Sequence, residues 1–161
     1  RFARQRESLD RRFVTASARY AFNFGGYVMP SVNWLAVVVA AVAMFGLGAV
    51  WYSPVLFLNQ WVKAAGLEID YAKRGNFALI LGTSFGLTLI LAVLLAFFIA
   101  GPGVTLGFAL EASLAAGLGF ATLSMGIIAL FERRPRAYML INGGYITVGF
   151  LLMGLILGVW R

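Results

Sequence analysis

The stretch FALILGTSFGLTLILAVLLAFFIA, residues 77–100, contains 24 residues and no charged side chain. A helix of this length is about 36 Å long at 1.5 Å per residue, which is enough to cross a hydrocarbon core of about 30 Å. Its apolar residues fall on all sides of a helix instead of along one stripe, which is typical of a helix surrounded by lipid. The stretch therefore predicts a membrane-spanning helix.

Three other apolar runs have a comparable length and extend over about 34–52, 104–131 and 139–160. The composition agrees, because 61% of the residues are hydrophobic and 12% are charged, against about 45–50% and 25% in soluble domains. Gly101-Pro102-Gly103 predicts a tight turn between the second and third runs. We expect an all-α fold, an integral membrane bundle of four transmembrane helices.

The residue inventory excludes several kinds of chemistry. The chain has no Cys and no His, so it has no disulfide, thiolate metal site, histidine general base or Ser-His-Asp triad. We therefore expect no enzyme activity, no cofactor and no metal site. The net charge of +7 is better explained by orientation in a bilayer than by nucleic acid, because the chain is so apolar.

Residues 1–28 form an extension of different character from the four-span domain, residues 29–161. The extension has six arginines and two acidic residues. Its large apolar residues share one helical face; they are Phe2, Leu9, Phe13, Tyr20 and Phe24. Three interpretations stay open: a basic amphipathic helix at the membrane surface, a cleaved presequence, or a mistranslated leader upstream of a start at Met29.

Charge also predicts an orientation for residues 29–161. The two longer loops hold six Lys and Arg residues, whereas the opposite side holds only Arg161. The positive-inside rule then places both termini outside. The six arginines of the extension would remove this bias, so we expect that residues 1–28 are dispensable for insertion.

Several short motifs resemble those of a known family. They are MPSVNW (29–34), WYSPVLF (51–57), FERRP (131–135), LINGGY (140–145) and MGLILGVW (153–160). Over Met29–Trp160 the chain resembles small bacterial membrane proteins catalogued as domain of unknown function 1761. The resemblance implies a four-span membrane protein with no established activity. The family pattern has a His after the Gly-Tyr pair, where this chain has Ile146, and a polar position near Ile127 and Ile128.

Three polar side chains inside the predicted spans are candidates for a function. Glu111 is the only carboxylate within a span, and such a residue is expected to face other helices or water; the alternative is that it lies in the membrane interface near the helix start, where the helix dipole favours it. Asn142 and Tyr145 open the fourth span. An Asn at this position is expected to hydrogen-bond to a neighbouring helix or to contact a substrate.

Small residues four positions apart predict close helix packing. Such pairs are Gly82 with Gly86, Ala115 with Gly119, and Gly154 with Gly158. Arg133, Arg134 and Arg136 follow the third span and predict a topology determinant or a contact with lipid headgroups.

These features favour a multi-pass protein of the cell inner (plasma) membrane. We expect it to act without catalysis, as a scaffold or an accessory subunit of a membrane complex, with the lipid bilayer and a membrane protein or a second copy as partners. The alternative is a small transporter or channel-like oligomer that uses Glu111.

Overall fold

Four long helices make up most of the computed structural model, which describes residues 22–24, 27–29, 32–68, 76–101 and 103–160. The four are long and apolar enough to cross a membrane. They are α2 (Trp34–Trp51), α4 (Phe77–Ile99), the continuous third span Leu106–Phe131, and α7 (Arg136–Val159). The predicted all-α bundle of four transmembrane helices is therefore confirmed.

Local capping explains where these helices begin. The side-chain oxygens of Asn33, Asn76 and Thr105 each accept a hydrogen bond from a backbone N–H three residues later, so each of these residues is an N-cap. The predicted start of the third span near residue 104 moves to Leu106. The fourth span begins at Arg136 instead of residue 139, because Pro135 has an extended conformation that suits the position before a helix.

A short antiparallel hairpin precedes the bundle. It consists of β1 (Phe22–Phe24) and β2 (Tyr27–Met29), with Phe22 paired to Met29. The helical face predicted for the extension therefore does not include Phe24, because that residue lies in a strand. The rest of that prediction falls on residues 1–21, which lie outside the described residues.

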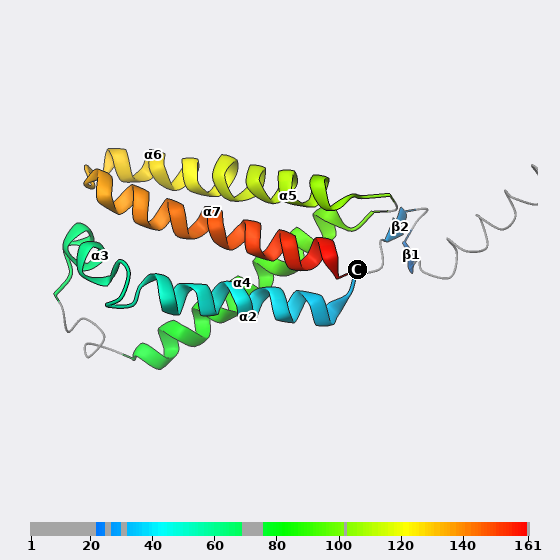
Figure 1. The fold of residues 1–161 in the computed structure, drawn as a ribbon, viewed down its shortest axis with the longest axis horizontal. Coiled ribbons are helices and arrows are strands. Elements are labelled where there is room, and N and C mark those ends of the chain that lie inside the picture. The colour runs from blue at the N-terminus through cyan, green and yellow to red at the C-terminus, as the bar shows by residue number, and fades with distance from the viewer. Residues whose placement is uncertain (1–21, 25–26, 30–31, 69–75, 102, 161) are drawn as a thin grey trace, which may run out of the picture.

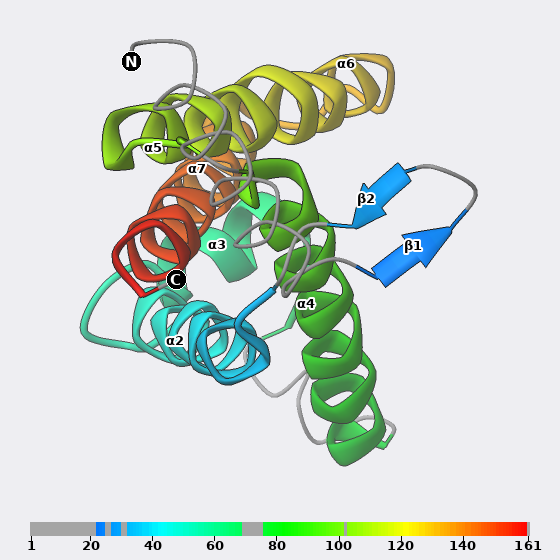
Figure 2. The ribbon, with the colours of Figure 1, turned by 90° about the vertical axis from the view of Figure 1, so that its right-hand side faces the viewer.

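Helix α7 is the centre of the bundle. Figure 2 shows α7 between α2 on one side and the third span on the other, and Figure 1 shows that α2 and α7 run in opposite directions. Met153 of α7 is fully buried, and Val37 of α2 is nearly so. Because α2 and α7 run in opposite directions, the start of α2 and the end of α7 lie at the same end of the bundle. This is the arrangement expected for the first and last of four spans that alternate in direction.

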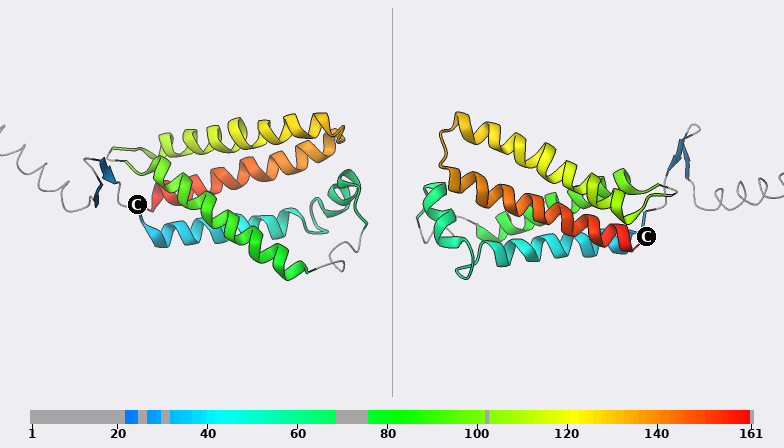
Figure 3. Two further views of the ribbon diagram at one scale, coloured as in Figure 1. Left: turned by 180° about the vertical axis from the view of Figure 1, so that it is seen from behind. Right: turned by 45° about the horizontal axis from the view of Figure 1, so that its top comes forward.

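Helix α4 packs on the bundle mainly through its second half, although the ring of Phe85, in the first half, lies edge to face with that of Phe45 of α2 at a centroid distance of 5.4 Å. Its buried residues begin at Thr88 and continue to Ile99, and Phe97 contacts Trp34 of α2 edge to face. The first half, residues 77–87, contains no buried residue. Figure 3 shows this half directed away from the other helices.

The third span consists of α5 (Leu106–Leu114), the π-helix η2 (Ala115–Thr122) and α6 (Leu123–Phe131). The wider π turn lies against α7. A Cβ atom on Gly117 would be 2.6 Å from the Cβ of Phe150, so the two helices meet there without room for a side chain. The Thr122 hydroxyl donates to the carbonyl of Gly143 at 3.1 Å, which ties the end of the π segment to α7.

A fifth helix that the sequence analysis did not predict, α3 (Leu58–Ala65), lies in the loop after α2. It contacts α7, buries Val62 and Ala64, and leaves Lys63 exposed. It ends at Gly66, whose φ of 70° is the left-handed conformation common after a helix.

Candidate functional site

The site lies at the end of the bundle where α2 ends, α3 lies and α7 begins. It joins two motifs that are far apart in the sequence, WYSP after α2 and INGGY in α7. The indole N–H of Trp51 donates to the backbone carbonyl of Ile141 at 3.0 Å. The hydroxyl of the next residue, Tyr52, donates to Oδ1 of Asn142 at 2.8 Å. Adjacent residues of one motif therefore bind adjacent residues of the other.

Asn142 accepts a second hydrogen bond at the same oxygen. The indole N–H of Trp61, on α3, donates to Oδ1 at 3.1 Å. An indole N–H can only donate, so the atom that it faces must be the carbonyl oxygen of the amide. This contact determines the orientation of the Asn142 side chain, and one oxygen links α2, α3 and α7.

Aromatic rings surround this amide. The ring of Tyr52 lies edge to face with the rings of Trp61 and Tyr145, at centroid distances of 5.2 and 5.3 Å. Trp51 contacts Phe57, in the loop before α3, at 5.0 Å. We call Trp51, Tyr52, Trp61, Asn142 and Tyr145 the aromatic–amide cluster.

Two glycines give the rings their space. A Cβ atom on Gly48 would lie 3.1 Å from the hydroxyl oxygen of Tyr145, and one on Gly144 would lie 3.0 Å from the indole of Trp51. The hydroxyl of Tyr145 also reaches the carbonyl of Met44, at 3.5 Å, the limit of a hydrogen bond. The cluster is thus closely packed and holds α2 against α7.

Tyr52 is kept in its neutral form. Burial raises the pKa of its phenol above the usual value of 10.0, and nearby Tyr145 and Tyr138 raise it further, since a phenolate would be desolvated and close to other phenols. Tyr52 is therefore a hydrogen-bond donor over the physiological pH range. It is not an acid or base matched to proton transfer near pH 7.

The glycine pair of the fourth span packs within the chain. A Cβ atom on Gly154 would overlap the side chain of Ser113, and one on Gly158 would lie 2.9 Å from the Cβ of Ala109. Both contacts are with α5. Ser113 is fully buried and donates from its hydroxyl to the carbonyl of Ala109 at 2.6 Å. The close approach of α5 and α7 therefore depends on this glycine face.

The other small-residue pairs face away from the chain. A Cβ atom on Gly82, Gly86 or Gly119 would meet no other atom within 4 Å. Ala115 is exposed as well. The predicted packing faces on α4 and on the third span thus have no neighbouring helix among the described residues.

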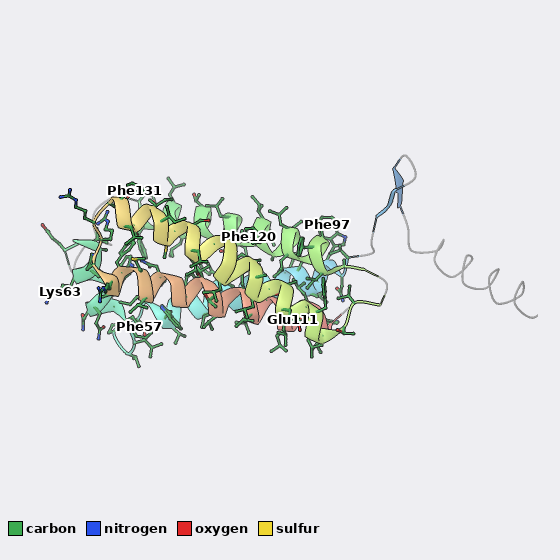
Figure 4. The ribbon with its side chains drawn as sticks, turned by 90° about the horizontal axis from the view of Figure 1, so that it is seen from above. Phe57, Lys63, Phe97, Glu111, Phe120 and Phe131 are labelled. Carbon is green, nitrogen blue, oxygen red and sulfur yellow. The ribbon has the colours of Figure 1, made fainter. Side chains whose placement is uncertain are left out.

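Glu111 lies far from the aromatic–amide cluster. Figure 4 shows it at the opposite end of the bundle from Lys63 and Phe57. It is exposed on α5, five residues after the helix begins, and its carboxylate forms no hydrogen bond or ion pair with another described residue. Glu111 therefore does not face another helix among the described residues, and both the functional and the interfacial interpretation of this carboxylate stay open.

The three arginines lie at the end of the bundle that holds α3. All three are exposed, and Arg134 pairs with Glu132 at 3.0 Å. Within the part of the chain that the structure describes, no group of three Asp or Glu residues that could hold a metal ion is present. The family's His position is Ile146, half-buried against the core, and Ile127 and Ile128 are exposed to the outside.

Sequence reasoning found Asn142 and Tyr145 but missed three residues that complete their surroundings. Trp51 and Tyr52 lie at the end of α2 and Trp61 lies on α3, and none of the three was named as a candidate site residue. A signal was available, because Trp51 and Tyr52 lie in one motif of the family and Asn142 in another. The motifs could be paired only after the fold brought them together.

These elements define a multi-pass membrane protein whose polar groups bind one another. The family model for "Protein of unknown function (DUF1761)" matches residues 35–158. The chain belongs to this family, and the predicted resemblance is confirmed. No curated protein and no solved structure matches the chain.

Proposed function

We propose that this chain is a non-catalytic scaffold or accessory subunit of a membrane complex, located in the inner (plasma) membrane. Its partner would be another membrane protein that packs on the outer glycine faces. These faces are Gly82 with Gly86 on α4, and Ala115 with Gly119 on the third span.

The observation that carries the proposal is the open first half of α4. None of residues 77–87 is buried, and both glycines of this half have space for a side chain. In lipid, helices associate through close van der Waals contact and hydrogen bonds, because acyl chains are as apolar as leucine. Two glycines four residues apart favour such a close contact, although each lowers helix propensity by about 1 kcal/mol relative to Ala.

The interior supports a packing role as well. Asn142, Thr122, Ser113 and Thr88 each use a polar side-chain atom in a hydrogen bond with this chain. Among the described residues, no buried side-chain nitrogen or oxygen lacks a partner. Binding a solute at these atoms would require that existing hydrogen bonds, within a helix for Ser113 and Thr88 and between helices for Asn142 and Thr122, break.

The test is purification of the tagged chain in a mild detergent, with identification of the proteins that co-purify. Gly82→Leu and Gly86→Leu place large side chains on the outer face of α4, so they should release the partner and leave thermal unfolding unchanged. Gly46→Leu is the matched control, because Gly46 lies on α2 and also has nothing within 4 Å of an added Cβ. It should retain the partner.

The same preparation separates this proposal from its rivals. Retention of every co-purifying protein by both α4 variants would contradict the proposal. If the natural chain self-associates and both α4 variants do not, the partner would be a second copy of this chain. A flux in proteoliposomes that Glu111→Gln abolishes, with the fold intact, would replace the scaffold with the transporter.

A further inference from the structure

The turn between α6 and α7 concentrates positive charge at the membrane surface. The turn extends only over Glu132–Pro135, and α7 begins at Arg136. Since a membrane-spanning helix enters and leaves it, its side chains lie in the headgroup region. Three arginines and one carboxylate, Glu132, occupy this segment.

Arg134 is already engaged within the chain. Its Nε donates to Oε2 of Glu132 at 3.0 Å, and its Nη1 donates to the backbone carbonyl of Ala65, at the end of α3, at 3.1 Å. Its guanidinium carbon is also 5.4 Å from the ring centroid of Tyr138. Arg134 therefore connects α3 to the turn, and its positive charge neutralises the carboxylate of Glu132.

Arg133 and Arg136 are in the opposite situation. Both are exposed, and neither guanidinium group forms a hydrogen bond or an ion pair with another described residue. The one carboxylate of the turn is bound to Arg134. The guanidinium groups of Arg133 and Arg136 stay charged at any physiological pH. Their charges are not balanced within the turn, because its one carboxylate is paired with Arg134.

We propose that Arg133 and Arg136 together bind the phosphate of an anionic phospholipid headgroup. A guanidinium group matches the geometry of phosphate with two parallel hydrogen bonds. The cytoplasmic membrane surface is enriched in anionic lipids, which attract juxtamembrane cations. Arg134 is excluded from this role, because its donors are directed to Glu132 and Ala65. This inference does not depend on the proposed function.

The test measures the binding of phosphatidylglycerol to the full chain in phosphatidylcholine nanodiscs, by native mass spectrometry and by the rise in melting temperature. Arg133→Gln and Arg136→Gln should each weaken the preference for phosphatidylglycerol about five-fold. The double variant Arg134→Gln/Glu132→Gln should lower the melting temperature and leave the lipid preference in place, since it breaks the contact with α3 without freeing a carboxylate beside Arg133 and Arg136. Lys63→Gln, at the same end of the bundle on α3, is the matched loss of one charge outside the proposed site and should change the preference less than either arginine variant does.

Three results would overturn the proposal. Equal losses for Lys63→Gln and for the two arginine variants would indicate a diffuse surface potential without a site. Displacement of the lipid by inorganic phosphate at equal concentration would make a free phosphate the ligand. Unchanged lipid binding in the double variant Arg133→Gln/Arg136→Gln, with loss of a co-purifying protein, would assign the arginines to a protein contact.

Discussion

Gly154 of α7 lies against Ser113 of α5 so closely that a Cβ atom on the glycine would overlap the serine side chain. Ser113 is itself fully buried and bonded to its own helix. Neither residue can yield without a shift of one helix relative to the other.

We expect Gly154→Ala to destabilise the bundle by about 1–3 kcal/mol, the usual cost of overpacking a tight core. Ser113→Gly removes the obstructing side chain, so the double variant Gly154→Ala/Ser113→Gly should recover part of the loss. The measurement is unfolding in detergent, and Gly82→Ala is the control because nothing lies within 4 Å of its added Cβ. Equal stability of Gly154→Ala and Gly82→Ala would contradict this packing.

Replacement of Asn142 by Leu should cost about 1–3 kcal/mol, because it leaves the hydroxyl of Tyr52 and the indole N–H of Trp61 without their shared acceptor. Tyr52→Phe should cost less, about 0.5–1.5 kcal/mol, since Trp61 still binds the amide. Tryptophan fluorescence provides the measurement: α3 should separate from α7 in Asn142→Leu, and the emission of Trp61 should shift. A spectrum identical to that of the natural chain would exclude the shared acceptor.

Tyr52 also predicts a loss of stability in alkali. Its pKa is raised above 10.0 in the folded chain, so its contribution is fully present below pH 10 and is lost as the pH rises through the raised value. We expect the free energy of unfolding to fall above pH 10, and to fall less in Tyr52→Phe. Parallel pH profiles for the natural chain and Tyr52→Phe would refute this assignment.

The spans could be predicted from the sequence because length and apolar composition alone are enough to place a helix in the lipid bilayer. Residues 77–100 are uncharged and long enough to cross the membrane, whatever they pack against. The start of α7 was placed three residues late, because charged Arg136 was taken to lie outside the helix. A helix can extend beyond the hydrocarbon core, and Pro135 allows this one to begin at once.

The candidate site was less predictable, since its contacts join distant segments. Asn142 meets Tyr52 and Trp61 across 90 and 81 positions, a distance that no local period encodes. The π segment depends on Gly117 lying against Phe150, and its small residues are equally compatible with an α-helix. The sequence also did not distinguish the glycine pairs that face protein from those that face outward. Gly82 and Gly154 are each followed by a second glycine four residues later, so only the packing of the helices separates them.

A chain that starts at Met29 should insert and fold like the full chain. The family match covers residues 35–158, and the four spans lie within residues 34–159. The measurement is membrane fractionation followed by thermal unfolding in detergent. Loss of insertion, or a markedly lower melting temperature, would make the extension a necessary part of the membrane domain.

The orientation is tested by reporter fusions after Arg136 and after Arg161. Figure 4 shows Lys63 and Phe131 at one end of the bundle. Arg133, Arg134 and Arg136 directly follow Phe131 in the chain, and the positive-inside rule places this end in the cytoplasm. A fusion after Arg136 should therefore report the cytoplasm, whereas a fusion after Arg161, one span later, should report the outside. Neutralising Arg133 and Arg136 together should weaken this bias and increase the fraction of inverted chains. Identical compartments for the two fusions would exclude the four-span arrangement, and the reverse assignment would show that the loop charges do not set the orientation.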